Sequence, residues 1–256
     1  MVSLDRVPRP FVVAVVVERT MAAAARATAA SLRDGADAVE LNLASLGRAD
    51  QPRRAFFGRV ARPVYTSCRR AAFMRVYGRP FARLPVWSEE TRLGRQLEAL
   101  KLGSAGLDIE ADTFAPSASG WTKDREAIRR QREVIATAHR RGCAVICSWH
   151  PPHKLTEAVA LRAVRTLAGR GADFVKIVER TRNVVEALDS AAISLRLRDR
   201  APVPFVMLPL GPGAETVRPL MTAFGAAYLL ARPPVGSNRL PAQPLVARAQ
   251  QLVGVL

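Results

Sequence analysis

The regular alternation of short apolar segments with longer amphipathic segments constrains the fold of this chain more than any other feature. Eight segments rich in Val and Ile have the length and composition of β-strands. Most of them are apolar nearly throughout, as strands covered on both faces must be. Segments of helical periodicity separate them, so the pattern indicates repeated βα units and a parallel sheet. The expected strands are 10–17, 36–42, 62–68, 105–111, 142–148, 172–178, 203–209 and 225–231.

The number of these units favours one α/β architecture. Eight strands and as many helices in 256 residues fit a (β/α)8 TIM barrel, which typically takes about 250 residues, better than a doubly wound sheet. No Gly-x-Gly-x-x-Gly motif follows the first apolar segment, so a dinucleotide-binding fold has no support. Because no linker or low-complexity tract interrupts the pattern, we expect a single barrel domain over residues 1–256.

The charge balance points to an anionic partner without choosing its kind. The chain has 39 Lys and Arg residues against 22 Asp and Glu residues, a net charge of +17. Only four of the 39 are Lys, and nine Arg but no acidic residue fall between positions 51 and 88. A nucleic acid, an anionic membrane, or a carboxylate or phosphate substrate would each suit this balance, and so would a compositional preference for Arg.

Cysteine usage and hydropathy predict a soluble, cytoplasmic protein. Cys68, Cys143 and Cys147 show no disulfide-framework spacing, so we expect buried free thiols in a reducing compartment. The apolar run at 11–17 is too short to span a membrane and lacks a signal-peptide cleavage pattern. We therefore expect no membrane association.

Ionisable residues interrupt several of the apolar segments at or just beyond their C-terminal ends. In a (β/α)8 barrel, these strand ends and the loops that follow them form the active site. Six different units contribute such residues, which we therefore expect to converge on one pocket. They are Glu40, Arg69, Arg70, Asp108, Glu110, His150, Lys176 and Arg218.

Lys176 is the most informative of these residues. It lies inside the apolar run 174–178, although a lysine is rarely buried without a partner. A lysine held in a barrel interior can act as a free amine near neutral pH, the state that Schiff-base formation with a carbonyl substrate requires. The alternative is a side chain that extends to solvent or pairs with Glu179.

His150 follows an apolar strand at the same rim and is a candidate general acid and base, because the pKa of histidine lies near the operating pH. The alternative is a hydrogen-bonded structural histidine. His153 lies three residues further on, but no Cys, Asp or Glu at ligand spacing accompanies the pair. We therefore expect no metal, and no sequence motif calls for another cofactor.

The order and spacing of these segments resemble type I 3-dehydroquinate dehydratase over nearly the whole chain. The matching motifs include VEL at 39–41, TSCRR at 66–70 and LPAQ at 240–243. The most specific stretches are 148–177, which runs from SWH to DFVKI, and 217–229, which contains MTAFG. The resemblance implies a (β/α)8 barrel that dehydrates 3-dehydroquinate to 3-dehydroshikimate without a cofactor, usually as a dimer.

The resemblance also implies a role for individual residues. Lys176 matches the lysine that turns the substrate ketone into an iminium electron sink. His150 matches the histidine that moves protons during imine formation, removal of the adjacent proton and hydroxyl departure. The remaining matches concern substrate binding: Glu40 and Arg69 would hold ring hydroxyls, Arg218 would clamp the carboxylate and Gln243 would belong to the final substrate loop.

The chain departs from the family pattern beside the histidine. The family pairs that histidine with a glutamate four residues after the arginine of the third strand, and this position is Phe73 here. Glu89 or Glu90 is a candidate for a replacement carboxylate that swings into the site.

Other departures affect substrate contacts. Asn42 and Ala44 stand where the family has Arg and Asp. Arg239 stands where a serine helps to bind the carboxylate, and we expect Arg239 to point at that carboxylate instead. The loop after the third strand is also longer than in the family, by roughly seven residues. These changes put the substrate in question more than the chemistry.

Three functions follow from these observations. The leading one is a Schiff-base hydro-lyase acting on 3-dehydroquinate. The second retains Lys176 and His150 but processes another anionic keto compound in specialised metabolism. The third is a barrel without lyase activity that binds an anionic partner such as nucleic acid. The low content of aromatic residues, 6%, and the lack of a nucleic-acid motif disfavour this third function. We expect a small keto or carboxylate substrate, a homodimer and no nucleic-acid partner.

Overall fold

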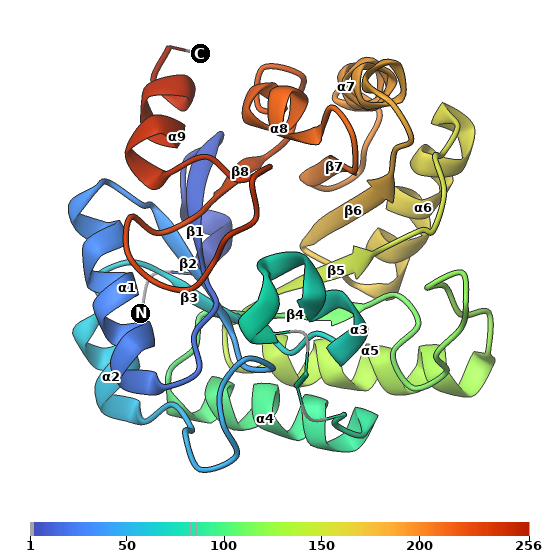
Figure 1. The fold of residues 1–256 in the computed structure, drawn as a ribbon. Coiled ribbons are helices and arrows are strands. Elements are labelled where there is room, and N and C mark those ends of the chain that lie inside the picture. The colour runs from blue at the N-terminus through green and yellow to red at the C-terminus, as the bar shows by residue number, and fades with distance from the viewer. Residues whose placement is uncertain (1–2, 82, 85, 256) are drawn as a thin grey trace.

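The computed structural model describes residues 3–81, 83–84 and 86–255 and shows a parallel sheet rolled into a nearly closed barrel (Figure 1). Neighbouring strands pair in the order β7-β6-β5-β4-β3-β2-β1-β8, and every ladder is parallel. All eight strands expected from the sequence are confirmed, and with them the (β/α)8 architecture. The strands are β1 Phe11–Val16, β2 Ala38–Asn42, β3 Val64–Ser67, β4 Gly106–Glu110, β5 Ala144–Trp149, β6 Phe174–Arg180, β7 Phe205–Leu210 and β8 Tyr228–Ala231.

Helices surround the strands (Figure 1). Five of the longer ones begin at a polar N-cap whose side chain accepts a hydrogen bond from a backbone N–H of the first turn, which fixes where each helix starts. The α-helices are α1 Met21–Arg33, α2 Arg54–Arg59, α3 Ala71–Met74, α4 Glu89–Leu102, α5 Arg125–His139, α6 Glu157–Arg170, α7 Val184–Leu197, α8 Ala214–Val217 and α9 Val246–Val253. Short 3-10 turns are η1 Leu4–Arg6, η2 Arg75–Tyr77, η3 Arg79–Phe81 and η4 Arg218–Leu220.

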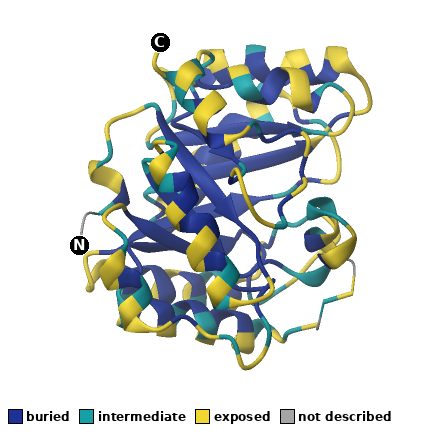
Figure 2. Cartoon of the chain, turned by 60° about the vertical axis from the view of Figure 1, so that its left-hand side comes forward, coloured by how far each residue is buried: buried dark blue, intermediate teal, exposed yellow. Residues whose placement is uncertain are grey.

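The strands form the buried centre of the molecule, and the outward faces of the helices are exposed (Figure 2). Three aromatic rings meet at the N-terminal end of the barrel: Phe11 and Tyr228 lie 5.3 Å apart, and Phe174 lies 6.4 and 6.2 Å from them. Lys176 lies two residues beyond Phe174 on β6, so its side chain points to the same side of the strand. The aromatic layer therefore forms a floor below Lys176.

The barrel is weakly joined at one place. Within the described residues no ladder forms between β7 and β8, and a single backbone hydrogen bond connects them, from the Ala227 N–H to the Phe205 carbonyl at 2.8 Å.

Cys68, Cys143 and Cys147 are buried and free, as expected. No helix in the part of the chain that the structure describes is long and apolar enough to cross a bilayer.

Candidate active site

A small cavity of about 50 Å³ lies at the C-terminal ends of the strands. Six of the ten residues that the sequence places at the site line it, and they come from six different strands or the loops after them, whereas Arg70, Asp108, Glu110 and Arg239 do not line it. Hydrophobic side chains from other units complete its walls. The lining residues are Glu40, Arg69, Phe73, Val76, Tyr77, His150, Lys176, Val178, Leu210, Arg218, Leu230, Leu240 and Gln243.

Lys176 points into this cavity and is paired with carboxylates. Its Nζ lies 2.6 Å from Oδ2 of Asp108 and 3.6 Å from Oε2 of Glu40, and its side chain is 3% exposed. The alternative of a solvent-directed lysine or a Glu179 pair is wrong. Glu179 is engaged elsewhere, since its Oε2 accepts a hydrogen bond from the backbone N–H of Leu155 at 2.7 Å.

Asp108, in the middle of β4, is the centre of the buried polar cluster. It contacts the Arg69 guanidinium, and its Oδ1 accepts a hydrogen bond from the Ser148 hydroxyl at 2.6 Å. Burial opposes ionisation of Asp108, but the charges of Arg69 and Lys176 outweigh it and lower the pKa of Asp108 to about 2. The sequence pattern placed Asp108 near the pocket without a role, and the structure makes it the closest charged partner of Lys176.

Glu40 supplies a second buried carboxylate. Its two oxygens accept hydrogen bonds from Tyr65 Oη at 2.9 Å and Ser67 Oγ at 2.6 Å. Its Oε1 also lies 3.9 Å from the Arg69 guanidinium. Two carboxylates thus face two cations, Arg69 and Lys176, which is the balance that a buried ionic cluster requires.

His150 faces an aromatic ring instead of a carboxylate. The centroids of the His150 and Phe73 rings lie 4.8 Å apart at an interplanar angle of 44°. Within the described residues no side chain forms a hydrogen bond with the imidazole, which argues against the structural-histidine alternative. Burial, followed by the positive charges of Arg69 and Lys176, lowers the pKa of His150 well below its ordinary value of 6.5. The imidazole is therefore neutral at neutral pH and can accept a proton.

The expected replacement carboxylates do not reach His150. Glu89 instead pairs with the Arg70 guanidinium at 2.9 Å and also contacts Arg92. Glu90 is exposed and lies 4.0 Å from Arg130. Neither candidate therefore stands in for the missing glutamate in this structure, because neighbouring arginines hold Glu89 and solvent surrounds Glu90.

Arg218 provides a buried positive charge at the wall of the cavity. It begins η4 beyond β7 and is 3% exposed. No acidic side chain among the described residues pairs with it, and burial lowers its pKa to about 10, so it remains charged at neutral pH. A buried guanidinium that lines a cavity without a carboxylate partner is suited to binding the carboxylate of a ligand.

The loop after β8 places one of its two predicted site residues in the cavity. Gln243 is buried there, and its Oε1 accepts a hydrogen bond from Asn238 Nδ2 at 2.8 Å. Arg239 is exposed and does not line the cavity. The expected direction of the Arg239 side chain is thus not observed, because only its backbone faces the site region, where its N–H donates to the Tyr77 carbonyl at 3.4 Å.

The other altered positions stabilise a turn. Asn42 Oδ1 accepts a hydrogen bond from the Ala44 N–H at 3.0 Å, and neither residue lines the cavity.

No group of three or more metal-ligating side chains occurs within residues 3–81, 83–84 and 86–255. The absence of a cofactor stays a prediction.

These observations define a class of protein. It is a (β/α)8 barrel enzyme in which a lysine amine, a neutral imidazole and a free guanidinium share one cavity, a set suited to Schiff-base chemistry on an anionic carbonyl compound. The chain belongs to the type I 3-dehydroquinase family, whose model matches residues 11–256. The resemblance that its motifs indicated is confirmed, and the chain is accordingly a hydro-lyase.

Solved structures agree with this fold. The 3-dehydroquinate dehydratase of Geobacillus kaustophilus matches with a TM-score of 0.77 at 18% identity, over 100% of this chain and 95% of that one. The enzyme of Enterococcus faecalis matches with a TM-score of 0.74 at 19% identity, over 100% and 99% of the two chains. The type I enzyme of Clostridium difficile, with covalently modified comenic acid, gives 0.74 at 14% identity, over 96% and 92%. No curated protein matches the sequence.

Proposed function

We propose that this chain dehydrates 3-dehydroquinate to 3-dehydroshikimate through an imine on Lys176. One observation carries the proposal: the Lys176 amine, with carboxylates at 2.6 and 3.6 Å, shares a cavity with the imidazole of His150 and with the guanidinium of Arg218, for which the described residues offer no acidic partner. The Lys176 amine, the two carboxylates and the His150 imidazole serve the chemistry, whereas the Arg218 guanidinium serves substrate recognition.

The reaction begins when the Lys176 ammonium passes a proton to His150 and the free amine attacks the substrate ketone; His150 returns that proton as the adduct loses water. Loss of water from the adduct gives an iminium, which withdraws electrons from the adjacent carbon so that His150 can remove its proton. The resulting enamine expels the hydroxyl group, which leaves as water after it takes a proton from His150. Hydrolysis of the remaining iminium releases the product and restores the lysine.

Asp108 and Arg218 support opposite parts of this sequence. Asp108 is ionised, and a carboxylate 2.6 Å from Nζ stabilises the positive charge of the iminium. Arg218 would bind the substrate carboxylate through two parallel hydrogen bonds. Glu40 and Arg69 would contact ring hydroxyls, and Gln243 would close the loop side of the site.

A second substrate class also has specific support. Phe73 packs on His150 where the family has a carboxylate, and the cavity walls include Val178, Leu210, Leu230 and Leu240. This apolar wall suits an anionic keto compound with fewer hydroxyl groups than 3-dehydroquinate, processed by the same Lys176 and His150.

Borohydride trapping tests both candidates. The protein is incubated with 3-dehydroquinate and borohydride, and the adduct is located by intact mass and peptide mapping among only four lysines. We expect turnover and an adduct on Lys176, with no adduct in Lys176→Ala and a normal adduct in the exposed control Lys101→Ala.

The other outcomes separate the alternatives. A wild-type chain that is labelled by other keto acids but not by 3-dehydroquinate would support the second substrate class. An adduct that persists in Lys176→Ala would show that the nucleophile is misassigned. No labelling by any carbonyl compound would exclude Schiff-base chemistry.

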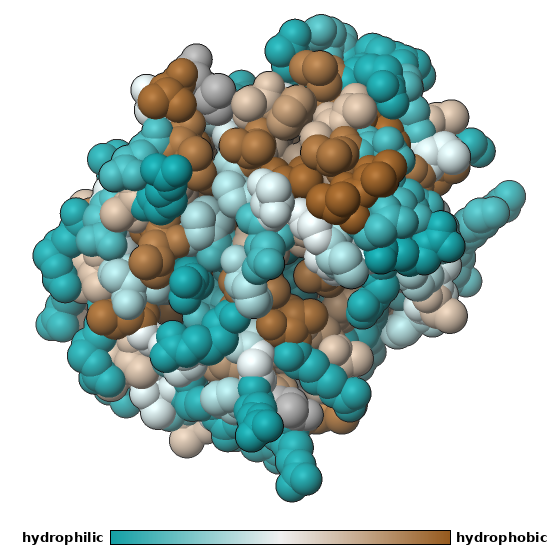
Figure 3. Space-filling view, turned by 45° about the horizontal axis from the view of Figure 1, so that its top comes forward, coloured by the Kyte–Doolittle hydropathy of each residue, from teal (hydrophilic) through white to brown (hydrophobic). Residues whose placement is uncertain are grey.

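We also propose a homodimer in a reducing compartment such as the cytoplasm. Large apolar side chains that are 42–62% exposed gather along α7 and the neighbouring η4, an apolar surface visible in the upper right of Figure 3. Sedimentation velocity should give a dimer for the wild type and a monomer for Leu188→Glu, and a monomeric wild type would refute the dimer. The patch contains Val184, Val185, Leu188, Leu195 and Leu220.

A further inference from the structure

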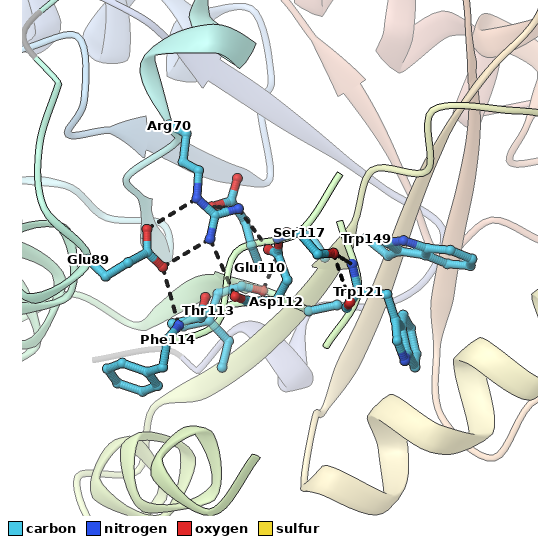
Figure 4. Close-up of polar contacts among 12 residues, drawn as sticks. Arg70, Glu89, Glu110, Asp112, Thr113, Phe114, Ser117, Trp121 and Trp149 are labelled. Carbon is cyan, nitrogen blue, oxygen red and sulfur yellow. Dashed lines mark hydrogen bonds and ion pairs between the residues drawn. The ribbon is translucent and has the colours of Figure 1, made fainter. Parts of the chain in front are cut away.

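Arg70 organises a polar network beside the candidate active site (Figure 4). It follows Arg69 at the end of β3, and its Nε and Nη2 donate to the two oxygens of Glu89 at 3.1 and 2.9 Å. Its Nη1 donates to Asp112 Oδ1 at 2.7 Å and lies 3.5 Å from Glu110 Oε2. One guanidinium thus joins α4, the end of β4 and the loop beyond it.

The network positions Phe73, whose ring packs against the His150 imidazole. Arg70 is the N-cap of α3, and its carbonyl accepts a hydrogen bond from the Phe73 N–H at 2.9 Å. Phe73 is the residue whose ring lies 4.8 Å from the imidazole. Because the Arg70 side chain is fixed by three carboxylates, the start of this one-turn helix is fixed as well.

The same network positions the turn 117–121, which packs against the backbone of His150. Oδ2 of Asp112 accepts a hydrogen bond from the Ser117 N–H at 2.9 Å, which fixes the turn 117–121. The carbonyl of Ser119 accepts a hydrogen bond from Trp149 Nε1 at 2.9 Å. Gly120, with φ +65°, packs so closely that a Cβ there would lie 3.1 Å from the His150 carbonyl oxygen. The turn therefore supports the peptide that carries the imidazole.

A strained residue shows how firmly this loop is held. Phe114 is the only described non-glycine residue with a positive φ, 74°. Its N–H donates to Glu89 Oε2 at 3.3 Å, and the Arg130 guanidinium lies 3.8 Å from its ring centroid. A bulky residue adopts this conformation only where its surroundings enforce it, and Glu89 connects this residue to Arg70.

We propose that Arg70 is a positioning residue that holds His150 between Phe73 and the turn 117–121. This role rests on the proposed function and replaces, by packing, the orientation that a carboxylate beside the histidine would provide. Arginine suits the task because its planar fork meets Glu89 through two parallel hydrogen bonds while a third nitrogen-bound hydrogen reaches Asp112. The single ammonium of lysine cannot span these partners.

The experiment compares Arg70→Met with Arg129→Met. Arg129 also bonds to two carboxylates, Glu126 and Glu133, but on the exposed face of α5. We expect Arg70→Met to lower kcat by about 10- to 100-fold with KM little changed, because misplacement of a reacting group costs rate rather than binding. The adduct on Lys176 should persist, and Arg129→Met should behave as wild type.

A second readout separates positioning from loss of stability. The chain has three histidines, so NMR can follow the titration of His150 in the folded protein. His150 faces positive Arg69, Lys176 and Arg70 and negative Asp108. In Arg70→Lys, which keeps the positive charge, loss of the flanking packing should raise the apparent pKa of His150, whereas a variant that is merely less stable would leave this pKa unchanged.

Two further variants complete the test. Arg70→Lys should fail to restore kcat, and Asp112→Asn should reproduce part of the loss if Arg70→Met does not fold. Wild-type kcat and an unchanged His150 titration in Arg70→Met or Asp112→Asn would overturn the proposal. If the wild-type chain neither turns over 3-dehydroquinate nor forms an adduct, the proposed function fails, and the His150 titration still decides the role of Arg70.

Discussion

The Nζ of Lys176 lies 2.6 Å from Oδ2 of Asp108, although the two residues are on strands β6 and β4, which are separated by β5. Both strands direct these side chains into the barrel, where the Arg69 guanidinium contacts the same carboxylate. The pairing keeps an ionised carboxylate beside the amine that would form the imine. Its removal should therefore affect both stability and rate.

Asp108→Asn should destabilise the protein at pH 7 by about 3 kcal/mol or more, because breaking a buried ionic cluster leaves charges uncompensated. The pKa of Asp108 falls from 3.8 to about 2 on folding. Its stabilisation is therefore complete above pH 4 and is lost as the pH falls from about 4 to 2, by an amount on the order of 2 kcal/mol. Urea unfolding between pH 2.5 and pH 6 should show a shallower acid dependence in the variant. Equal slopes would contradict the role of Asp108.

Phe73→Glu would place a carboxylate where the family has one. A negative charge beside the imidazole favours its protonated form and should raise the pKa of His150, against the opposing charges of Arg69 and Lys176. The acid limb of the kcat/KM profile should consequently move to higher pH. Phe73→Gln is the uncharged control, and an acid limb that coincides for both variants would refute the explanation.

Arg218→Met should separate binding from stability. Loss of charged hydrogen bonds to a substrate carboxylate should raise KM by about 10- to 100-fold. The melting temperature should stay the same or rise, since Arg218 has no acidic partner in the described part of the chain and its burial lowers its pKa to about 10. The same substitution at Arg69, which balances Asp108 and Glu40, should instead lower the melting temperature. A marked stability loss in Arg218→Met would show that Arg218 has an internal partner and would contradict this assignment.

Glu18→Gln should loosen the loop after β8. The two oxygens of Glu18 accept hydrogen bonds from the N–H and the hydroxyl of Ser237, at 2.6 and 2.8 Å, and this loop carries Leu240 and Gln243 into the cavity. In the variant, one of the two Ser237 donors faces an amide NH2 group and loses its acceptor. Proteolysis of the segment 232–245 should therefore accelerate. KM should rise several-fold, which corresponds to the loss of roughly one charged hydrogen bond. Ser237→Ala should act in the same direction, and unchanged cleavage in both variants would exclude this clamp.

The strands, and most of the polar residues that line the cavity, could be predicted from the sequence because local patterns encode their positions. Runs of β-branched residues mark buried strands, and a lysine inside such a run is conspicuous. The partner of Lys176 was less accessible: Glu179 is its neighbour along the chain, but Asp108 lies 68 residues away and reaches Lys176 only when the sheet rolls into a barrel.

The Arg70 network was hidden for a similar reason. Its arginine belongs to the stretch 51–88, which has nine Arg and no acidic residue, and its carboxylates Glu89, Glu110 and Asp112 come from later segments. The error for Arg239 has another cause. A match between sequences assigns a position in a loop, but the direction of a side chain depends on the local backbone, which here turns Arg239 outwards.

The single hydrogen bond between β7 and β8 divides the site into a firm part and an adaptable part. Lys176, Asp108 and Glu40 lie on strands joined by continuous ladders, whereas Arg218 follows β7 and Gln243 follows β8, one on each side of the seam. Small changes in the width of this seam would alter the spacing of Arg218 and Gln243, which we propose contact the substrate, and would leave Lys176, Asp108 and Glu40 in register. Substitutions near the seam would therefore change which carboxylic acids the barrel binds while the reacting groups stay in place. In laboratory evolution, we expect new substrate preferences to arise first from substitutions at this seam.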